Sequence, residues 1–316
     1  MKKAKWIFVA VLTITLFAGL FYRYSKENKG YERTEFLFDT QCTITAYGKE
    51  AKTAVDAAFD HIAQIHSMTN FYSKSSQVED INNQAAGTEI FVDKELSRIL
   101  TAALDVGSSS QGAFDITVAS VATLWEFSGG GRVPTEDEIK RKLEFVGADK
   151  LRFDRKSTLI KNNDNVKIDL GGAAKGYAGD VAIDILKKYN VVGAIADLGG
   201  NITCFGKNPN SSDGKWRIGL QKPFAPAGEY EDIVEIEEGA VVTSGIYQRY
   251  FEKNGKRYHH IIDPQTGYPA EAEYSSVTIV SDSSLYADCL ATACYVLGED
   301  KGKELADKYS AEIYFR

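Results

Sequence analysis

From residue 149 to the C-terminus, the sequence is a series of short apolar segments separated by glycine-containing turns. Only two stretches in this region have helical periodicity, at residues 173–189 and 283–297. A doubly wound parallel sheet would need a helix after nearly every strand. The pattern therefore predicts an α+β fold in which largely antiparallel sheets pack against helices.

The preceding part of the chain is expected to supply one strand and two helices. Residues 34–48 alternate apolar and polar side chains and are rich in β-branched residues, which predicts a strand. Apolar residues recur at helical spacing over 51–68 and 93–109. The largely polar stretch 69–76 between them predicts a turn.

A loop and a short helix are expected next. Three consecutive glycines at 129–131 indicate the loop. Thr135 and Glu138 have the spacing of a capping box, which predicts a helix that ends near Gly147. No repeat or low-complexity linker divides the chain, so the sequence predicts one folded domain, residues 31–316, after an N-terminal segment, residues 1–30.

The N-terminal segment is typical of a membrane anchor. Its run from Trp6 to Tyr22 is 17 uncharged, mainly apolar residues, at the short limit for a spanning helix. The basic residues that flank this run are Lys2, Lys3, Lys5, Arg23, Lys26 and Lys29. Because no small-x-small cleavage site follows, we expect an uncleaved anchor at the cell membrane, with the folded domain on the extracytoplasmic side. A cleaved secretory signal is the alternative.

The charge of the chain argues against nucleic acid as its main partner. The 316 residues have a formal net charge of −7, and no basic run follows the N-terminal segment. An acidic protein that binds phosphates needs local positive charge from a metal ion, a lysine or backbone amides. Zinc is not expected, because the four cysteines and four histidines lack finger-like spacing. Buried thiols and disulfides both remain open for Cys42, Cys204, Cys289 and Cys294.

A glycine-rich turn, residues 169–177 with sequence DLGGAAKGY, joins a strand expected to end at Leu170 to the helix at 173–189. Glycines allow the backbone to approach a ligand, and helix N-terminal amides together with the Lys175 ammonium can bind a diphosphate. The turn fits neither the Walker loop nor the G-x-G-x-x-G fingerprint. Taken alone, a plain turn with an exposed lysine is the simpler interpretation.

The helix at 283–297 carries a polar pair on an apolar background. Asp288 and Thr292 are four residues apart, so they share one helical face. A carboxylate and a hydroxyl so placed can bind Mg²⁺, with waters, backbone oxygens and phosphate in its other positions. The alternative is that the pair belongs to a polar stripe that faces water. The neighbouring alanines, leucine and cysteine argue against this alternative, because they surround the pair with apolar side chains.

Two further segments carry an acid or a histidine at a turn. Residues 258–269, YHHIIDPQTGYP, contain His260, a candidate general base near neutral pH, followed by turn chemistry at Asp263. Residues 112–117, GAFDIT, form a turn with an aromatic and an acid. Each has a structural alternative: a core histidine with satisfied hydrogen bonds, or an aspartate that caps its turn.

Taken together and in this order, the four segments resemble the motifs of the ApbE family, the FAD:protein FMN transferases. The similarity extends from Glu35 to the C-terminus and includes residues 196–201 (ADLGGN) and 243–247 (TSGIY). The resemblance implies Mg²⁺-dependent transfer of FMN from FAD to a threonine or serine hydroxyl of an exported acceptor protein, with release of AMP. An FAD pyrophosphatase, and a protein that binds FAD without reaction, are the alternatives.

The resemblance also implies roles for individual residues. Those implied to contact FAD are Phe38, Tyr72, Ala113, Phe114, Asp115, Asp169, Lys175 and Ile262. Those implied to bind the metal are Gly172, through its backbone oxygen, Asp288 and Thr292. The chain departs from the family at residues 38–40, where relatives often have Met-Gly-Thr, and at Ala291, where some have a further acid. His260 is the residue expected to take the acceptor's proton.

Overall fold

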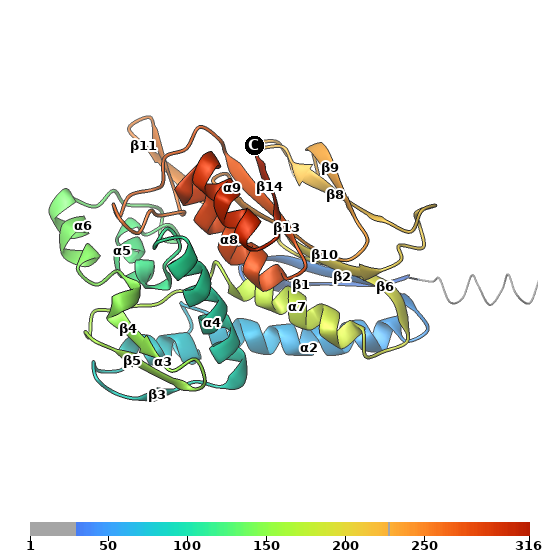
Figure 1. Cartoon of the computed structure of the whole chain (residues 1–316), viewed down its shortest axis with the longest axis horizontal. Coiled ribbons are helices and arrows are strands. Elements are labelled where there is room, and N and C mark those ends of the chain that lie inside the picture. The colour runs from blue at the N-terminus through green and yellow to red at the C-terminus, as the bar shows by residue number, and fades with distance from the viewer. Residues whose placement is uncertain (1–29, 227) are drawn as a thin grey trace, which may run out of the picture.

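A seven-stranded sheet with strand order β1-β2-β6-β7-β10-β13-β14 is the centre of the computed structural model, which describes residues 30–226 and 228–316 (Figure 1). Every neighbouring pair of these strands is antiparallel. The strands are β1 (Gly30–Leu37), β2 (Thr40–Gly48), β6 (Val191–Leu198), β7 (Asn201–Gly206), β10 (Gly239–Gly245), β13 (Ser276–Ser281) and β14 (Glu312–Phe315). The predicted α+β class with antiparallel sheets is confirmed.

The helices lie mainly on one face of this sheet, where α2, α7 and α8 pack against its strands (Figure 1). The helices are α2 (Ala51–Thr69), α3 (Gln77–Asn83), α4 (Lys94–Ser109), α5 (Ala119–Ala122), α6 (Glu136–Leu143), α7 (Ala174–Leu186), α8 (Ser284–Leu297) and α9 (Glu299–Lys308). The predicted helices are present within a few residues, although α6 ends before Gly147. The helices α3, α5 and α9 were not predicted, and α9 is a third helix in the region where only two were expected. Among the described residues, no helix has the length and apolarity needed to cross a membrane. The predicted membrane segment lies outside those residues.

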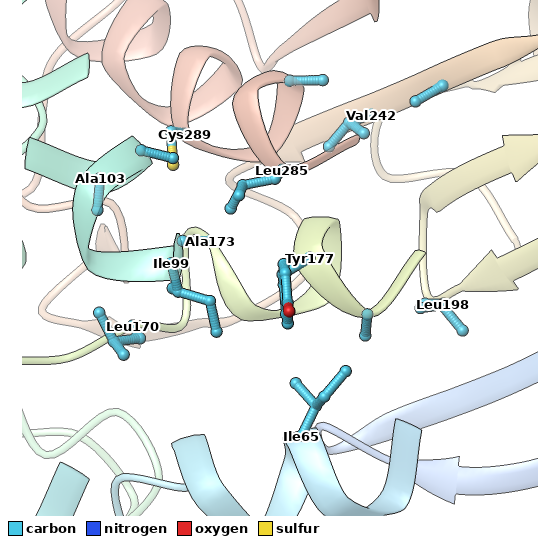
Figure 2. Close-up of a cluster of buried hydrophobic side chains, with 14 of the residues drawn as sticks. Ile65, Ile99, Ala103, Leu170, Ala173, Tyr177, Leu198, Val242, Leu285 and Cys289 are labelled. Carbon is cyan, nitrogen blue, oxygen red and sulfur yellow. The ribbon is translucent and has the colours of Figure 1, made fainter. Parts of the chain in front are cut away.

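The main core forms where α2, α4, α7 and α8 meet beneath the sheet (Figure 2). Ile65, Ile99, Tyr177 and Leu285 come from these four helices, and all four are buried. Burial of each such side chain stabilises the fold by about 1.5–3 kcal/mol. This shared core fixes α7 and α8 relative to each other, and these two helices carry much of the site described below.

Gly176 brings α7 and α8 into backbone contact. A Cβ at this position would lie 2.3 Å from the Ser284 carbonyl oxygen and 2.8 Å from the Asp288 Cβ. Any larger side chain would therefore push the helices apart. The glycine places Asp288 directly beside the start of α7.

The opposite face of the sheet is covered by a hairpin of β8 (Trp216–Gln221) and β9 (Tyr230–Ile236). Alternate residues Trp216, Ile218 and Leu220 pack against Cys204 and Val241 of the sheet. The remaining strands form small sheets: β3 (Ile90–Phe91), β4 (Leu151–Phe153) and β5 (Thr158–Lys161) in one, and β11 (Tyr250–Lys253) with β12 (Lys256–His259) in another. All four cysteines are free and buried, as in the first of the two interpretations left open.

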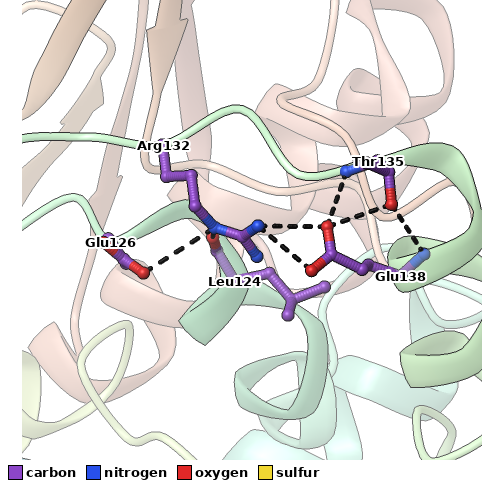
Figure 3. A network of polar contacts seen from close by, with 5 residues as sticks. All are labelled: Leu124, Glu126, Arg132, Thr135 and Glu138. Carbon is purple, nitrogen blue, oxygen red and sulfur yellow. Dashed lines mark hydrogen bonds and ion pairs between the residues drawn. The ribbon is translucent and has the colours of Figure 1, made fainter.

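The loop with three glycines is tied to the start of α6 by a polar network (Figure 3). Thr135 Oγ1 accepts the Glu138 backbone N–H at 3.3 Å, and Glu138 Oε2 accepts the Thr135 N–H at 2.8 Å. This reciprocal pair is the predicted capping box. Arg132 donates to both Glu138 carboxylate oxygens and, from Nε, to the Leu124 carbonyl oxygen. The network anchors the otherwise open loop.

The strand predicted at residues 34–48 is wrong as a continuous element. The chain turns at Phe38 and Asp39, and β1 and β2 pair on either side of them. Both turn residues have positive φ, 53° and 59°, as a two-residue hairpin of type I′ requires. Neither glycine nor asparagine marks the turn, so the alternating pattern runs through it without a visible break.

The strand predicted to end at Leu170 is also absent. The Ile168 backbone is instead bonded by the buried Asn82 side chain, which accepts its N–H at 2.8 Å and donates to its carbonyl oxygen at 3.0 Å. A side-chain amide thus takes the place of a neighbouring strand. It holds the extended segment that leads into the glycine-rich turn.

We expect Asn82→Ala to lower the free energy of unfolding by about 2–4 kcal/mol, because it leaves two buried backbone groups without partners. Urea denaturation measures this change. Asn83→Ala is the matched control, since that exposed side chain bonds only Glu79 within α3. Equal stability of the two variants would show that the amide does not hold the segment.

Candidate active site

A cavity of about 570 Å³ lies where the β1–β2 turn, the end of α2, the glycine-rich turn, the end of β10 and α8 meet. A volume of this size suits a small organic ligand. The predicted site residues that line it are Phe38, Tyr72, Ala113, Phe114, Asp115, Asp169, Gly172, Lys175, His260, Ile262, Asp288 and Thr292. Every residue proposed for FAD, metal or proton transfer therefore reaches one cavity.

The glycine-rich turn places Lys175 against the cavity at the start of α7. Its Nζ lies 3.4 Å from the Gly171 carbonyl oxygen and 3.9 Å from Asp288 Oδ1. Asp169 Oδ1 accepts the Gly171 N–H at 2.9 Å, which closes the turn. The surrounding protein desolvates Asp169 and so raises its pKa, although the residue is exposed to the cavity. The hydrogen bond from Gly171 and the positive charges of Arg249 and Lys175 oppose that rise. An ammonium and a helix N-terminus thus border the same space.

Asp288, Thr292 and Gly172 lie together beside Lys175. Asp288 is 3% exposed, and its Oδ2 accepts the Gly176 N–H at 2.9 Å. A Cβ on Gly172 would lie 3.5 Å from Thr292 Oγ1, so the turn backbone approaches that hydroxyl. The donor set is one carboxylate, one hydroxyl and backbone oxygen, all of the hard type that Mg²⁺ prefers, and it fits that ion. Within the described residues no three His, Cys, Asp or Glu side chains converge, so phosphate oxygens would have to complete the shell.

The turn at residues 112–117 forms an apolar wall with an acid at its edge. Ala113 and Phe114 are buried, and the Phe114 ring edge would lie 3.0 Å from a Cβ on Gly172. Asp115 caps the following 3₁₀ turn through the Thr117 N–H at 2.8 Å. Desolvation raises the Asp115 pKa, and the Thr117 hydrogen bonds oppose that rise. The predicted turn-capping alternative is thus present, in a residue that also lines the cavity.

Aromatic side chains frame the cavity where the predicted polar turn follows α2. Tyr72 is 65% exposed, and its ring meets Phe71 edge to face. Phe38 lies edge-on to His66, whose Nδ1 accepts the Phe38 backbone N–H at 3.1 Å. His66 therefore holds the strained β1–β2 turn against α2, and both partners line the cavity. The Tyr72 hydroxyl accepts a hydrogen bond from Ser128 Oγ at 3.3 Å, and its exposed ring is suited to stack on a planar ligand.

His260 lies at the base of the β11–β12 hairpin. Asn254 and Gly255 form its two-residue turn with φ of 52° and 75°, the type I′ geometry that pairs Tyr250 with His259. Arg249 and His260 are next in register, and the Arg249 carbonyl oxygen lies 3.1 Å from both the backbone nitrogen and Nδ1 of His260. Because a carbonyl oxygen only accepts hydrogen bonds, this contact requires a proton on Nδ1. In the neutral ring, Nε2 then has a free lone pair.

The pKa of His260 differs from the expectation of a base near neutral pH. Desolvation by the surrounding protein lowers this pKa to about 4, although the residue is only half-buried. The hydrogen bond to the Arg249 carbonyl oxygen opposes this shift, whereas the nearby positive charges of Arg249 and Lys175 add to it. The imidazole is therefore neutral at pH 7. It is available to accept a proton, but it is a weaker base than an ordinary histidine.

Comparison with known proteins agrees with this arrangement. The model of the ApbE family matches residues 38–315. The chain belongs to the ApbE family. A family member from Haemophilus influenzae, named FAD:protein FMN transferase, is 33% identical over an alignment of 282 residues, and the match covers 86% of this chain and 80% of that protein. One from Treponema pallidum with the same name is 31% identical over an alignment of 296 residues, and the match covers 88% of this chain and 82% of that protein.

Solved structures of ApbE proteins share the fold. The crystal structure of the ApbE protein from Thermotoga maritima has a TM-score of 0.82 and 32% sequence identity, and the match covers 91% of this chain and 94% of that one. The flavin transferase ApbE from Vibrio cholerae has a TM-score of 0.81 at 27% identity, covering 91% and 93%. These two ApbE structures thus share the overall fold of this chain.

Among the cavity residues that sequence reasoning did not assign to the site are His66 and Arg249, whose side chains could contact a ligand. His66 is four residues after the buried Ile62 on α2, so helical spacing places it at the edge of the apolar face. Arg249 had a clearer signal, because the Asn254-Gly255 pair predicts a tight hairpin that brings the residues before β11 and after β12 together. Both residues come from segments that the sequence analysis did not connect to the ApbE motifs.

Proposed function

We propose that this chain is an FAD:protein FMN transferase, which moves FMN from FAD to a threonine or serine hydroxyl of an exported acceptor protein and releases AMP. Its relatives from Haemophilus influenzae and Treponema pallidum carry that name. The observation that carries the proposal is the convergence of Lys175, Asp288 and His260 on one cavity. These residues offer positive charge, an oxygen ligand for a cation and a neutral imidazole.

The reaction forms one phosphorus–oxygen bond and breaks another. The acceptor hydroxyl oxygen attacks the FMN-side phosphorus, and the bond from that phosphorus to the bridging oxygen breaks, so that the electron pair leaves with AMP. His260 Nε2 accepts the hydroxyl proton, while the Arg249 carbonyl oxygen holds the ring through Nδ1. Lys175 offsets negative charge on the diphosphate as the bond to AMP breaks.

Mg²⁺ is part of the proposal because the donor set around Asp288 fits it. When bound, Mg²⁺ would supply further positive charge to the diphosphate oxygens. Asp288, Thr292 and the Gly172 backbone oxygen would hold it. Asp288 also accepts the Gly176 N–H, which fixes the orientation of the carboxylate whether or not a metal is bound.

Incubation of the protein with FAD, Mg²⁺ and candidate exported acceptors tests the proposal. Mass spectrometry is expected to find an acceptor peptide with FMN on a hydroxyl side chain, together with AMP. Free FMN and AMP without labelled acceptor would instead indicate an FAD pyrophosphatase. Unchanged FAD bound to the protein would indicate a binding protein without activity.

Lys175→Met is expected to weaken FAD binding by about 10- to 100-fold, because it removes a charged partner of the diphosphate and keeps most of the apolar stem. Titration of flavin fluorescence measures the dissociation constant. Lys188→Met is the control, since Lys188 is exposed beyond the far end of α7 and does not line the cavity. Equal affinity of the two variants would contradict a phosphate role for Lys175.

An extracytoplasmic location at the membrane is also part of the proposal. It is supported by the apolar run at residues 6–22 and its basic flanks. Cell fractionation with N-terminal sequencing tests it. A soluble mature protein that begins near Lys26 would contradict the anchor, and export would then depend on a cleaved signal.

A further inference from the structure

Arg249 brings a second cationic side chain to the cavity, on a different segment from Lys175. Its guanidinium lies 3.3 Å, through Nη2, from Asp39 Oδ2. The Arg249 and Asp39 side chains are 42% and 62% exposed, and both residues line the cavity. The reaction proposed above uses only the Arg249 carbonyl oxygen, so the charge of its side chain has no role yet.

The main chain of Arg249 is fixed although its side chain is half exposed. Its carbonyl oxygen is the acceptor for both His260 donors, at 3.1 Å each. The tight β11–β12 hairpin sets the register of this contact. Because these bonds involve only backbone of residue 249, the guanidinium can change partner without disturbing His260.

The charge of Arg249 acts on the same space as that of Lys175. Both cations lower the pKa of Asp169 against its desolvation, and both contribute to the low pKa of His260. FAD carries two phosphate groups, whereas Lys175 supplies one positive charge. The other charged or titratable groups that line the cavity are Asp39, His66, Tyr72, Asp115, Asp169, His260 and Asp288.

The present partner of Arg249 is weakly held. An exposed ion pair at 3.3 Å contributes little to stability, because water solvates both groups and the side chains lose freedom. A phosphate can accept two parallel hydrogen bonds from the guanidinium fork, which makes a shorter and stronger contact. Exchange of a carboxylate for a phosphate is therefore favourable when a diphosphate is close by.

We propose that Arg249 binds the diphosphate of FAD, and that Asp39 holds the guanidinium at the cavity edge and competes with the phosphates for it. This inference rests on FAD as the substrate. Asp39 is suited to the role because its turn backbone is fixed by the β1–β2 pairing and by the Phe38–His66 contact. Without a ligand, the Asp39 carboxylate offsets the positive charge of Arg249. A ligand with more negative charge, such as a diphosphate, displaces this carboxylate from the guanidinium.

Binding titrations with FAD and with riboflavin test the inference, since riboflavin has the flavin ring but no phosphate. Arg249→Ala should weaken FAD binding about 10- to 100-fold and leave riboflavin binding unchanged. The FAD affinity of Arg249→Lys should lie between those of the unmodified protein and Arg249→Ala, because lysine keeps the positive charge but loses the two parallel donors of the guanidinium. The Arg217→Ala variant is the control, since the Arg217 side chain is as exposed as that of Arg249, 43% against 42%, and pairs with Asp213 and Glu235 outside the cavity.

Asp39→Asn separates competition from simple positioning. Asparagine tolerates the positive φ of this turn and removes the charge. If Asp39 competes, this variant should bind FAD about 2- to 5-fold more tightly, since an exposed charge pair is weak. The gain should vanish in the Arg249→Ala background. If Asp39 only positions the guanidinium, the variant should bind FAD more weakly, and that result would overturn the competition.

The outcomes distinguish this inference from the proposed function. If the unmodified protein binds FAD and releases AMP but Arg249→Ala binds FAD normally, only the role of Arg249 is overturned. An equal loss of FAD and riboflavin binding in that variant also overturns it, since the effect would then be structural. If the unmodified protein does not bind FAD, the proposed function fails and this inference fails with it.

Discussion

Asp288→Asn is expected to abolish FMN transfer while the domain stays folded. The substituted amide would still offer an oxygen to the Gly176 N–H, which Asp288 Oδ2 now accepts at 2.9 Å. It would lack the negative charge that faces Lys175 and that a divalent cation requires. We expect transfer to fall by about 10²- to 10³-fold or more, with a change in unfolding free energy below about 1 kcal/mol. Release of AMP and urea denaturation measure the two quantities.

Alanine at this position is a less specific test than the sequence suggested. From the apolar surroundings of the helix, Asp288→Ala would be expected to leave no new buried charge and to spare the fold. The structure shows that it also removes the acceptor of a buried N–H, at a cost of about 1–3 kcal/mol. Lost activity in that variant would combine a weakened α7–α8 contact with lost chemistry.

Two controls complete the experiment on Asp288. Thr292→Val should reduce transfer less, because it removes a neutral oxygen and a 3.2 Å contact with Ser244 Oγ but keeps the side-chain shape. In the unmodified protein, a chelator should stop transfer and added Mg²⁺ should restore it. If Asp288→Asn keeps full, chelator-sensitive transfer, the metal is bound elsewhere.

The sequence predicted well the features that depend on periodicity within one element. Four-residue spacing placed Asp288 and Thr292 on one face of α8, and both side chains reach the cavity. The capping box at Thr135 and Glu138 formed as expected. Such features depend on short-range geometry, which residue spacing determines directly. The resemblance to the ApbE family then connected segments that spacing alone could not bring together.

The features that sequence reasoning missed depend on contacts between elements. The β1–β2 turn has Phe38 and Asp39 at positive φ without the usual glycine or asparagine, so pairing of its strands and the contact with His66 overcome a local preference. The segment before Leu170 reads as a strand, but it is bonded by Asn82 from a distant helix. In both cases the deciding partner is remote in sequence.

His260→Gln is expected to lower transfer by about 10²- to 10⁴-fold, which is the usual contribution of a general base, and to leave FAD affinity within about 3-fold. Glutamine keeps much of the side-chain volume of histidine, but it cannot accept a proton at pH 7. Retained transfer in this variant would assign the base to another residue. Single-turnover kinetics with saturating FAD separate the chemical step from binding.

The low pKa of His260 gives that experiment a pH dependence. Only the neutral imidazole can accept the proton, and desolvation lowers its pKa to about 4. In the free enzyme, kcat/KM of the unmodified protein should therefore stay level as pH falls from 7 to 5, and decline only toward pH 4. An ordinary histidine would give the decline near pH 6.5. A decline in that higher range would contradict His260 as the base in this environment.

His259 is a useful control, because its pKa is lowered as far as that of His260 while it lies outside the cavity, although it is more deeply buried. It is buried, it contacts the Ala270 carbonyl oxygen through Nε2, and desolvation lowers its pKa to about 4 as well. It does not line the cavity. Between pH 6.5 and 4, each of these histidines binds a proton more readily in the unfolded chain than in the folded protein. The free energy of unfolding therefore decreases as pH falls, by at most about 1.4 kcal/mol per pH unit for each histidine. Either glutamine variant should make this loss less steep, whereas only His260→Gln should stop transfer.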